Sequence, residues 1–375
     1  MAGIYIHIPY CKQKCNYCNF HFSINKNNVD DMISSMVIEL ESRVDYLENK
    51  KIETIYFGGG TPSIINYKYI RKLLSKIRDV YNVTANPEIT MEFNPDDIET
   101  EKLVQLKGLG VNRLSIGIQS FDDKDLIFMN RSHNSQEAIN SVRIAQENGF
   151  KNITVDLIYG LPDQTNKKWE ENLNRINELY IDHFSAYALT VEPKTELDFL
   201  IKQKKIKPLS DVLTTEHFKI LQKKSEEMGY IQYEISNFCR DRKLSEHNSS
   251  YWKNKWYLGI GPSAHSYNGT SRQWNIASNS KYITNIQNRC QYFEIEILNS
   301  NQIYNDYILT SLRTTWGVSK DYILKNFSKD IHNYFIKATK KWISNKQMKL
   351  TNGNYKLTKE GMLFADKIST DLFMI

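Results

Sequence analysis

Three of the five cysteines lie within eight residues near the start of the chain, as Cys11, Cys15 and Cys18. Their spacing, C-x3-C-x2-C, follows a short apolar run that resembles a strand. Three thiols this close together cannot all form disulfides with one another, and an odd number leaves one unpaired. Thiolates are ligands for zinc and for iron–sulfur clusters, so the spacing predicts a metal centre.

Two kinds of metal centre fit these cysteines. A tetrahedral zinc site takes four nitrogen or sulfur ligands, and because no fourth cysteine follows nearby it would need His7 or His21. A 4Fe–4S cluster held by three cysteines leaves one iron open. A bidentate ligand, such as the amino and carboxylate groups of S-adenosylmethionine (SAM), could occupy that iron.

Polar residues occur at or just beyond the ends of several predicted strands. The run Gly58-Gly59-Gly60-Thr61-Pro62 closes the first strand after the cysteines, and glycines there would let free backbone amides approach a ligand. Glu92, Gln119 and Asp156 end later strands, and Arg131 lies between two of them. Together they offer acceptors for ribose hydroxyls, donors for adenine and one cation for a carboxylate.

The elements that must position these residues alternate between strands and helices. Strands are predicted at 53–57, 88–93, 112–118, 153–159 and 184–191, with helices at 30–47, 70–77, 101–109, 136–148 and 168–179. Such βα units predict an α/β fold with a parallel sheet, either open or curled into a barrel. In barrels of this kind the chemistry lies where the strands end, which is where the polar residues fall.

The remainder of the chain does not continue the alternation of strands and helices. A helix is predicted from Pro208 to Gly229, and residues 230–275 are aromatic, rich in Asn, Ser and Gly, and predicted to be irregular. From about residue 305, helix-like stretches precede an Asn352-Gly353 hairpin signal, which predicts a small winged-helix-like domain. We expect three parts, at 1–230, 231–300 and 301–375.

Composition narrows the class of protein. The 375 residues carry 49 basic and 43 acidic side chains spread along the chain, so nucleic-acid binding is not expected from a net charge of +6. The first residues show no secretory signal, and no apolar run approaches the length of a membrane span. With Cys239 and Cys290 far apart, a disulfide framework is not expected either, so we predict a reducing compartment, the cytoplasm.

The cysteine spacing and the motifs after it closely resemble the radical-SAM superfamily. The likeness covers nearly the whole chain and is tightest at residues 4–20, 56–62, 113–162 and 246–266. It implies a partial (β/α)6 barrel in which Cys11, Cys15 and Cys18 hold a 4Fe–4S cluster. It also implies that SAM is bound by a set of nine residues: Tyr5, Tyr17, Gly59, Gly60, Thr61, Glu92, Gln119, Arg131 and Asp156.

Within the superfamily, the chain is similar to two related groups, the oxygen-independent coproporphyrinogen-III dehydrogenases (HemN) and the HemW haem chaperones. The dehydrogenases usually have a further cysteine two positions after the third, where this chain has Phe20, and a longer N-terminal arm. The segment containing His247, Tyr251 and Trp252 resembles the H-N-x-x-Y-W motif of the haem chaperones. An imidazole suits haem iron and flat rings suit the macrocycle, so these three residues are predicted to bind haem, with His265 as a weaker ligand candidate.

This resemblance implies a haem chaperone that binds a cluster, SAM and haem and passes haem to an acceptor protein, such as a membrane respiratory enzyme. An electron donor for the cluster is also implied. Two alternatives remain: oxidative decarboxylation of coproporphyrinogen III, and DNA-binding regulation through the winged-helix-like part with the cluster as sensor.

Overall fold

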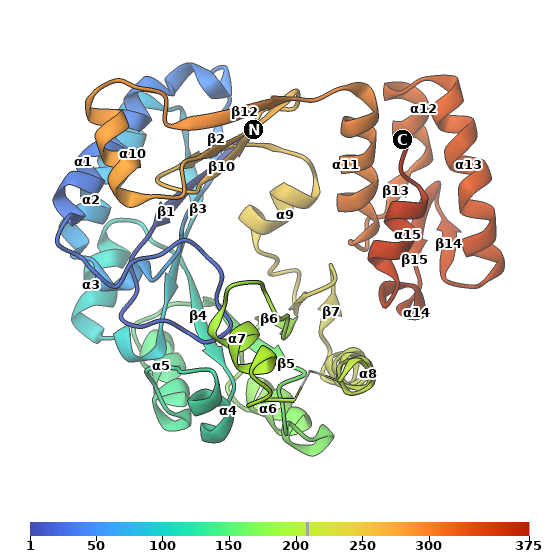
Figure 1. Cartoon of the computed structure of the whole chain (residues 1–375), viewed down its shortest axis with the longest axis horizontal. Helices are drawn as coiled ribbons and strands as arrows, with labels where there is room; N and C mark the ends of the chain where they lie inside the picture. The colour runs from blue at the N-terminus through green and yellow to red at the C-terminus, as the bar shows by residue number, and fades with distance from the viewer. Residues whose placement is uncertain (208–209, 375) are drawn as a thin grey trace.

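The computed structural model describes residues 1–207 and 210–374 of the chain. Its centre is a run of six parallel strands in sequence order, shown from blue to green in Figure 1. They are β1 (Ala2–Ile8), β2 (Ile52–Gly59), β3 (Val83–Phe93), β4 (Arg113–Gln119), β5 (Asn152–Tyr159) and β6 (His183–Ala188). The parallel sheet predicted from the alternating pattern is confirmed, and β1 is a strand as the apolar run indicated.

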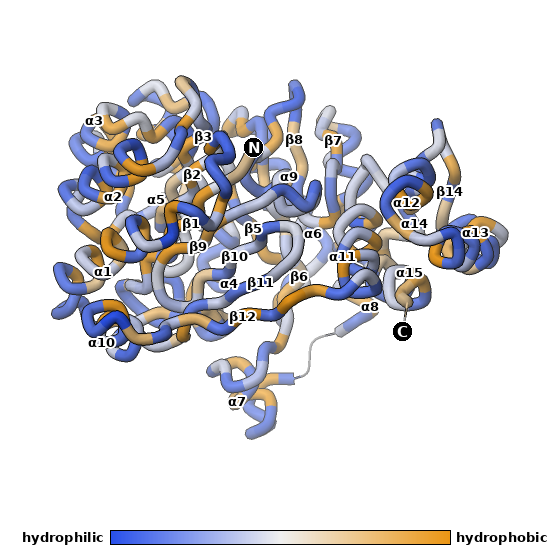
Figure 2. The backbone as a smooth tube through the Cα atoms, turned by 90° about the horizontal axis from the view of Figure 1, so that it is seen from above, coloured by the Kyte–Doolittle hydropathy of each residue, from blue (hydrophilic) through white to orange (hydrophobic). Residues whose placement is uncertain are grey.

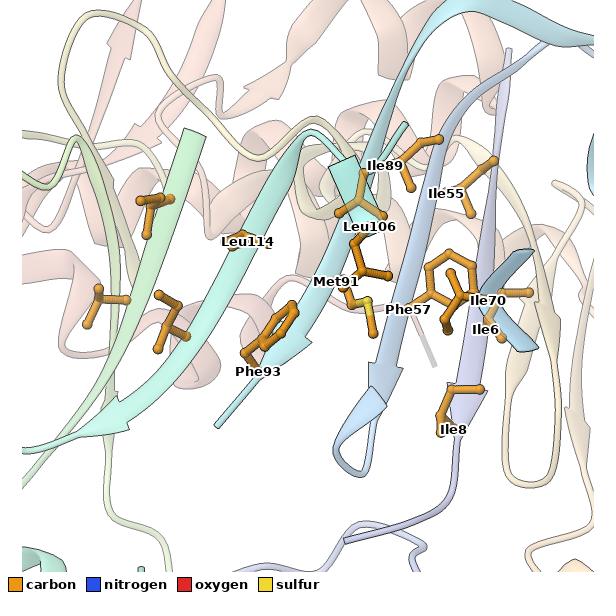
Figure 3. Packing of buried hydrophobic residues seen from close by; sticks show 14 of the residues in the cluster. Ile6, Ile8, Ile55, Phe57, Ile70, Ile89, Met91, Phe93, Leu106 and Leu114 are labelled. Atoms are coloured by element: carbon orange, nitrogen blue, oxygen red, sulfur yellow. The ribbon is translucent and has the colours of Figure 1, made fainter. Parts of the chain in front are cut away.

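Helices connect these strands and cover their outer face. The connecting helices are α1 (Val29–Ser42), α2 (Tyr67–Val80), α3 (Thr100–Gly108), α4 (Asp123–Phe128), α5 (Ser135–Glu147) and α6 (Asn166–Glu178). Ile70 of α2 and Leu106 of α3 lie against strand residues such as Phe57 and Met91 (Figure 3). Because successive side chains of a strand point to opposite faces, packing Ile4, Ile6 and Ile8 into this core turns Tyr5 and His7 inward.

The sheet does not close on itself. It contains twelve strands in the order β12-β11-β10-β9-β1-β2-β3-β4-β5-β6-β8-β7, so β12 and β7 are its edges. The two short strands β7 (Ile231–Gln232) and β8 (Asn237–Cys239) extend it beyond β6 in antiparallel pairing. The fold is therefore the expected partial barrel of the α/β class.

The segment predicted to be irregular is largely ordered into elements. It holds α9 (Glu246–Trp252), β9 (Trp256–Ile260), β10 (His265–Tyr267) and β11 (Ser271–Asn275), and β12 (Phe293–Ile297) follows after α10 (Asn279–Gln287). This part of the prediction was wrong because β9 pairs with β1, more than 250 residues earlier in the chain. Such long-range pairing overrides a local composition rich in turn residues.

The C-terminal part packs around a hydrophobic cluster of its own. Its elements are α11 (Ser300–Leu312), β13 (Val318–Ser319), α12 (Lys320–Asn326), α13 (Lys329–Ser344), β14 (Met348–Thr351), β15 (Asn354–Leu357), α14 (Lys359–Met362) and α15 (Ala365–Asp371). Asn352 and Gly353 connect β14 and β15, as the hairpin signal predicted. The three-stranded sheet with its helices confirms the winged-helix-like expectation, and Figure 2 shows these helices set beside the main sheet.

Two helices remain between the parts. Of these, α7 (Glu196–Lys202) follows β6, while the helix predicted from Pro208 is α8 (Asp211–Glu227), with Pro208 itself outside the described residues. Across residues 1–207 and 210–374, no helix is both long enough and apolar enough to cross a membrane.

A buried carboxylate joins α1 to the added strands. Glu39 is fully buried and accepts hydrogen bonds from the amide of Gly261 at 2.8 Å, from Asn275 Nδ2 at 2.8 Å and from the Tyr282 hydroxyl. Burial raises the pKa of Glu39 to about 7, and these hydrogen bonds limit the rise. No local pattern around Glu39 indicates this link, because its partners lie more than 220 residues away.

We expect Glu39→Gln to flatten the pH dependence of stability. Between the ordinary pKa of 4.5 and about 7, the native state holds a proton that the unfolded state releases, so Glu39 makes the protein less stable as pH rises. The loss is on the order of 3 kcal/mol between pH 5 and 7.5. Urea unfolding at both pH values measures it, with the exposed Glu41→Gln on the same helix as the control. An equally steep fall in Glu39→Gln would contradict the prediction.

Candidate functional site

The cysteine loop lies at the carboxyl end of β1 and is fixed by backbone contacts. The Cys11 amide donates to Ser23 O at 3.0 Å, and the Asn16 amide donates to Met129 O at 3.2 Å. The Asn16 side chain also donates to Phe128 O at 2.7 Å. The loop is therefore anchored to the turn between α4 and α5 before any ligand is considered.

The three thiols are half-buried and two of them contact polar side chains. Thr61 Oγ1 lies 3.6 Å from Cys11 Sγ, and Arg131 Nη1 lies 3.3 Å from Cys15 Sγ. Burial raises the pKa of Cys11 to about 11 and also raises the pKa of Cys18. Binding of iron, which requires thiolates, must therefore overcome this cost of deprotonation.

The two histidines considered as a fourth zinc ligand are held in other contacts. Within the described part of the chain, no three His, Cys, Asp or Glu side chains converge closely enough to hold a single metal ion. Both ring nitrogens of His7 are engaged, Nε2 with His21 O at 2.8 Å and Nδ1 with the Tyr5 hydroxyl at 3.1 Å. His21 Nε2 meets Asn279 Oδ1 at 2.7 Å. His7 therefore has no free ring nitrogen for a zinc ion, and the three thiols by themselves match the three irons that a cube with one open iron offers.

The glycine run differs from the prediction in one respect, because its amides are not free. The amides of Gly59, Gly60 and Thr61 donate to Glu92 Oε2, Ile8 O and Tyr10 O. Gly59 has φ +101°, and a Cβ there would lie 2.3 Å from the His7 ring, so only glycine fits. An ammonium group needs acceptors, so the carbonyl oxygens of this run, rather than its amides, are the groups suited to receive one.

Glu92 accepts hydrogen bonds from two residues of the neighbouring strand β2. Its Oε1 accepts from the Tyr56 hydroxyl at 2.8 Å, and its Oε2 accepts from the Gly59 amide at 3.1 Å. Burial raises the pKa of Glu92 to about 7, and the nearby Asp156 adds to the rise. Asp156 accepts from Ser115 Oγ at 3.2 Å, and burial raises the pKa of its carboxyl as well. Two carboxyl groups thus face the same interior space from β3 and β5.

Arg131 links the cysteines to the strand ends. Besides Cys15, its guanidinium donates to Asn94 Oδ1 at 2.8 Å and to Gly117 O at 2.6 Å. Its buried Nε has no hydrogen-bond partner among the described residues. A fixed cation with one donor to spare, beside the cysteine loop, fits an anionic ligand group such as a carboxylate.

Of the other predicted SAM residues, Gln119 and Tyr17 lie toward the carboxyl end of the sheet, whereas Tyr5 lies in the middle of β1. Gln119 ends β4 with φ +70°; it pairs with Leu157 of β5 after a register shift between Ile116 and Gln119. Tyr17 packs against a small apolar cluster that includes Met129, and burial raises its pKa. Tyr5 lies opposite Tyr56 in the register of β1 and β2, with ring centroids 6.0 Å apart.

The predicted haem residues lie elsewhere, at the amino-terminal end of the barrel strands. His247 of α9 is 2 % exposed, and both its ring nitrogens are engaged: Nδ1 with Thr54 Oγ1 and Nε2 with the Tyr251 hydroxyl, each at 2.8 Å. Its ring stacks on Tyr56 at 5.0 Å. Trp252 is half-buried at the end of the helix. The motif therefore closes the base of the barrel beneath the Glu92 group.

Sequence reasoning missed several residues of this interior. Tyr56 and Asn94 contact Glu92 and Arg131 directly, and Arg113 is a buried arginine beside Glu88 and Thr154. Tyr56 alternates with the outward-facing Phe57, a pattern that could have marked it as inward-facing. Arg113 carries no such signal, because a lone arginine at a strand start is usually exposed.

Comparisons with known proteins give the family. Residues 5–176 match the Radical SAM superfamily. The chain is 33% identical over 371 residues to "Heme chaperone HemW" of Bacillus subtilis, which covers 98% of each protein. It is 36% identical over 265 residues to "Heme chaperone HemW" of Escherichia coli, covering 70% of this chain and 69% of that one.

Among solved structures, coproporphyrinogen III oxidase (HemN) from Escherichia coli aligns with a TM-score of 0.86 at 22% identity. The alignment covers 100% of this chain and 90% of that one. At this identity the likeness establishes the fold alone. The superfamily implies a 4Fe–4S cluster and SAM, which agrees with the three thiols, the acceptors and the arginine described above. The near full-length match shows that this chain belongs to the HemW family of the radical SAM superfamily.

Proposed function

We propose that this protein is a haem chaperone that binds a 4Fe–4S cluster, SAM and haem and transfers haem to an acceptor protein. The observation that carries the proposal is the alignment to a protein named as a haem chaperone along nearly the whole of both chains. The free thiols of all five cysteines suit a reducing compartment, so we place the activity in the cytoplasm.

In this proposal Cys11, Cys15 and Cys18 hold the cluster, and the strand ends hold SAM. Arg131 pairs with the SAM carboxylate, and the carbonyl groups of the Gly59-Gly60 run accept hydrogen bonds from its amino group. Glu92 and Asp156 accept from the ribose hydroxyls, with Thr61 and Gln119 beside them and Tyr5 and Tyr17 flanking the ligand. When bound, the cluster and SAM supply radical chemistry, while these residues fix the orientation of the nucleotide.

We expect Tyr56→Phe to move the pH dependence of SAM binding upward. Glu92 must be ionised to accept two ribose hydroxyls, so SAM affinity should rise as pH passes through about 7. Tyr56 stabilises the carboxylate by its hydrogen bond, and its loss raises the pKa of Glu92 further, by about one unit. Calorimetric titration of the anaerobic cluster-loaded protein with SAM from pH 6 to 8.5 measures the midpoint, the pH at which SAM affinity reaches half of its rise.

Tyr159→Phe serves as the control for this prediction. Tyr159 is also a buried tyrosine on a barrel strand, but its ring packs on Trp169, away from the carboxyl groups. Its variant should keep the wild-type midpoint. A midpoint unchanged in Tyr56→Phe would show that Glu92 does not govern SAM binding.

Two measurements test the chaperone proposal against the enzyme alternative. Ferric haem is titrated into the protein and followed by absorption, and the loaded protein is then mixed with apomyoglobin as a generic acceptor. We expect saturable haem binding followed by transfer to the acceptor. The same protein with cluster, SAM, reductant and coproporphyrinogen III should yield no decarboxylated porphyrinogen. Absence of haem binding, or turnover of coproporphyrinogen III, would refute the proposal.

A further inference from the structure

The eight histidines differ sharply in how accessible their ring nitrogens are. Five are at least nine-tenths buried: His7, His133, His183, His217 and His247. His21 and His332 are half-buried, and His21 Nε2 is hydrogen-bonded to the Asn279 side chain. His265 is exposed, and in residues 1–207 and 210–374 no side-chain hydrogen bond is formed by its ring. Of the imidazoles described, His265 therefore meets the first requirement of an iron ligand, a free and reachable nitrogen.

The strand register places His265 on the inner face of the sheet. Tyr5 of β1 points inward and pairs with Gly259 of β9, while Gly3 pairs with Tyr257, so Tyr257 shares that face. Tyr257 in turn pairs with Tyr267 of β10, and His265, two residues from Tyr267, points the same way. The strands β9 to β11 therefore continue the inner face of the barrel beyond β1, and their inner face forms a shelf.

A flat aromatic ring lies next to His265 on this shelf. Trp274 of β11 is its cross-strand partner, and the two ring centroids are 6.4 Å apart at an angle of 32°. Gly259 lies beside them, and a Cβ there would be only 2.1 Å from His265 O. The close approach of the two strands here thus requires a glycine, and the shelf combines an imidazole with an indole, two flat rings suited to contact a macrocycle.

The shelf is next to the cysteine loop. The rings of His7 and His21 are 6.2 Å apart, and His21 follows Cys18 by three residues. Burial lowers the pKa of His7 to about 4, and the nearby rings of His21 and His265 add to this effect. His265 thus lies on the cluster side of the barrel, whereas His247 lies at its base.

His247 is poorly placed to bind iron in this arrangement. To bind iron, His247 would have to give up its hydrogen bond with Thr54 or the one with Tyr251. The amides of Glu246 and His247 are also held by the carboxylate of Glu88, at 3.1 and 2.9 Å, which fixes the start of α9. These contacts indicate that His247 holds α9 in position against the barrel.

We infer that haem binds on the shelf formed by β9, β10 and β11, with His265 as the ligand to its iron and Trp274 against the macrocycle. This inference rests on the proposed function, since it names the residues of the haem site of that chaperone. The bond formed is an imidazole nitrogen to iron bond, with no change of oxidation state. Haem then lies on the cluster side of the barrel, where an acceptor can reach it without displacement of α9.

Ferric haem titrated into the full-length protein tests the inference by absorption and electron paramagnetic resonance. We expect the wild type to give a histidine-ligated spectrum. His265→Gly should lose that spectrum and bind haem about tenfold or more weakly, and added free imidazole should restore the spectrum. His265→Cys should give a thiolate-ligated spectrum. His247→Gln and His21→Gln should keep the wild-type spectrum wherever circular dichroism shows that they fold.

The outcomes separate this inference from the proposed function. A wild type that binds no haem would refute the function itself. A wild type that binds haem, with a spectrum unchanged in His265→Gly, would overturn the inference and leave the function standing. Because His265 is exposed and makes no side-chain hydrogen bond among the described residues, its variants should fold as the wild type does.

Discussion

Anaerobically reconstituted Cys15→Ala should hold almost no iron, where the wild type holds about four irons per chain. Three thiols supply all the ligands that the loop offers, and loss of one leaves two, which cannot retain a cube that already has an open iron. Cys15 is also the thiol that Arg131 contacts, so its loss frees the arginine as well. Iron, sulfide and zinc are counted together, because zinc in place of iron in the wild type would contradict the cluster.

Cys290→Ala is the matched control for this experiment. Cys290 is an exposed free cysteine after α10, far in sequence from the loop, and it should not affect the iron content. Equal iron in Cys15→Ala and Cys290→Ala would show that the loop does not hold the metal.

Loss of the Arg131 guanidinium should weaken SAM binding and lower the free energy of unfolding. In Arg131→Met, Asn94 Oδ1 and Gly117 O lose a charged donor, and each such bond contributes about 1.5–3 kcal/mol. We expect unfolding in urea to show a loss on the order of 3 kcal/mol. Calorimetry of the cluster-loaded protein should show SAM affinity reduced by about a hundredfold, because the pairing with its carboxylate is gone.

Two further variants sharpen this prediction. Arg143→Met removes an exposed arginine from α5 and should change neither quantity. Arg131→Lys keeps the charge but loses the planar guanidinium group that reaches Asn94 and Gly117 together. Its losses of SAM affinity and stability should therefore be smaller than those of Arg131→Met and larger than those of Arg143→Met. Wild-type SAM affinity in Arg131→Met would exclude the arginine from the binding site.

Much of the barrel was predictable, because its βα units are local patterns. Apolar residues at helical spacing, such as Ile70, Leu73 and Ile77, mark a helix that packs on the sheet, and the structure has α2 at Tyr67–Val80. Parallel strands end at one edge of a sheet, so the positions of Cys11, Glu92 and Asp156 at strand ends already implied that they meet. The candidate cluster and SAM residues were predicted from this placement together with the likeness to the radical-SAM superfamily.

The added strands show where such reasoning fails. β9 is an ordered strand because its backbone pairs with β1, and nothing within residues 230–275 indicates that partner. The same holds for Glu39, whose partners Gly261, Asn275 and Tyr282 come from distant segments. Contacts of this kind depend on which chain segments the fold brings together, and a local pattern does not contain that information.

The predicted haem residues show most clearly what the sequence determines and what depends on the tertiary structure. The amino-acid sequence by itself determined the thiol spacing, the alternation of strands and helices and the likeness to a family, since all three are properties of residue type and order. Only the tertiary structure decided that His247 is buried with both nitrogens engaged, while His265 is exposed beside Trp274. The physical reason is that the availability of a ligand atom depends on which neighbours surround it, and those neighbours come from strands and helices far away in the chain.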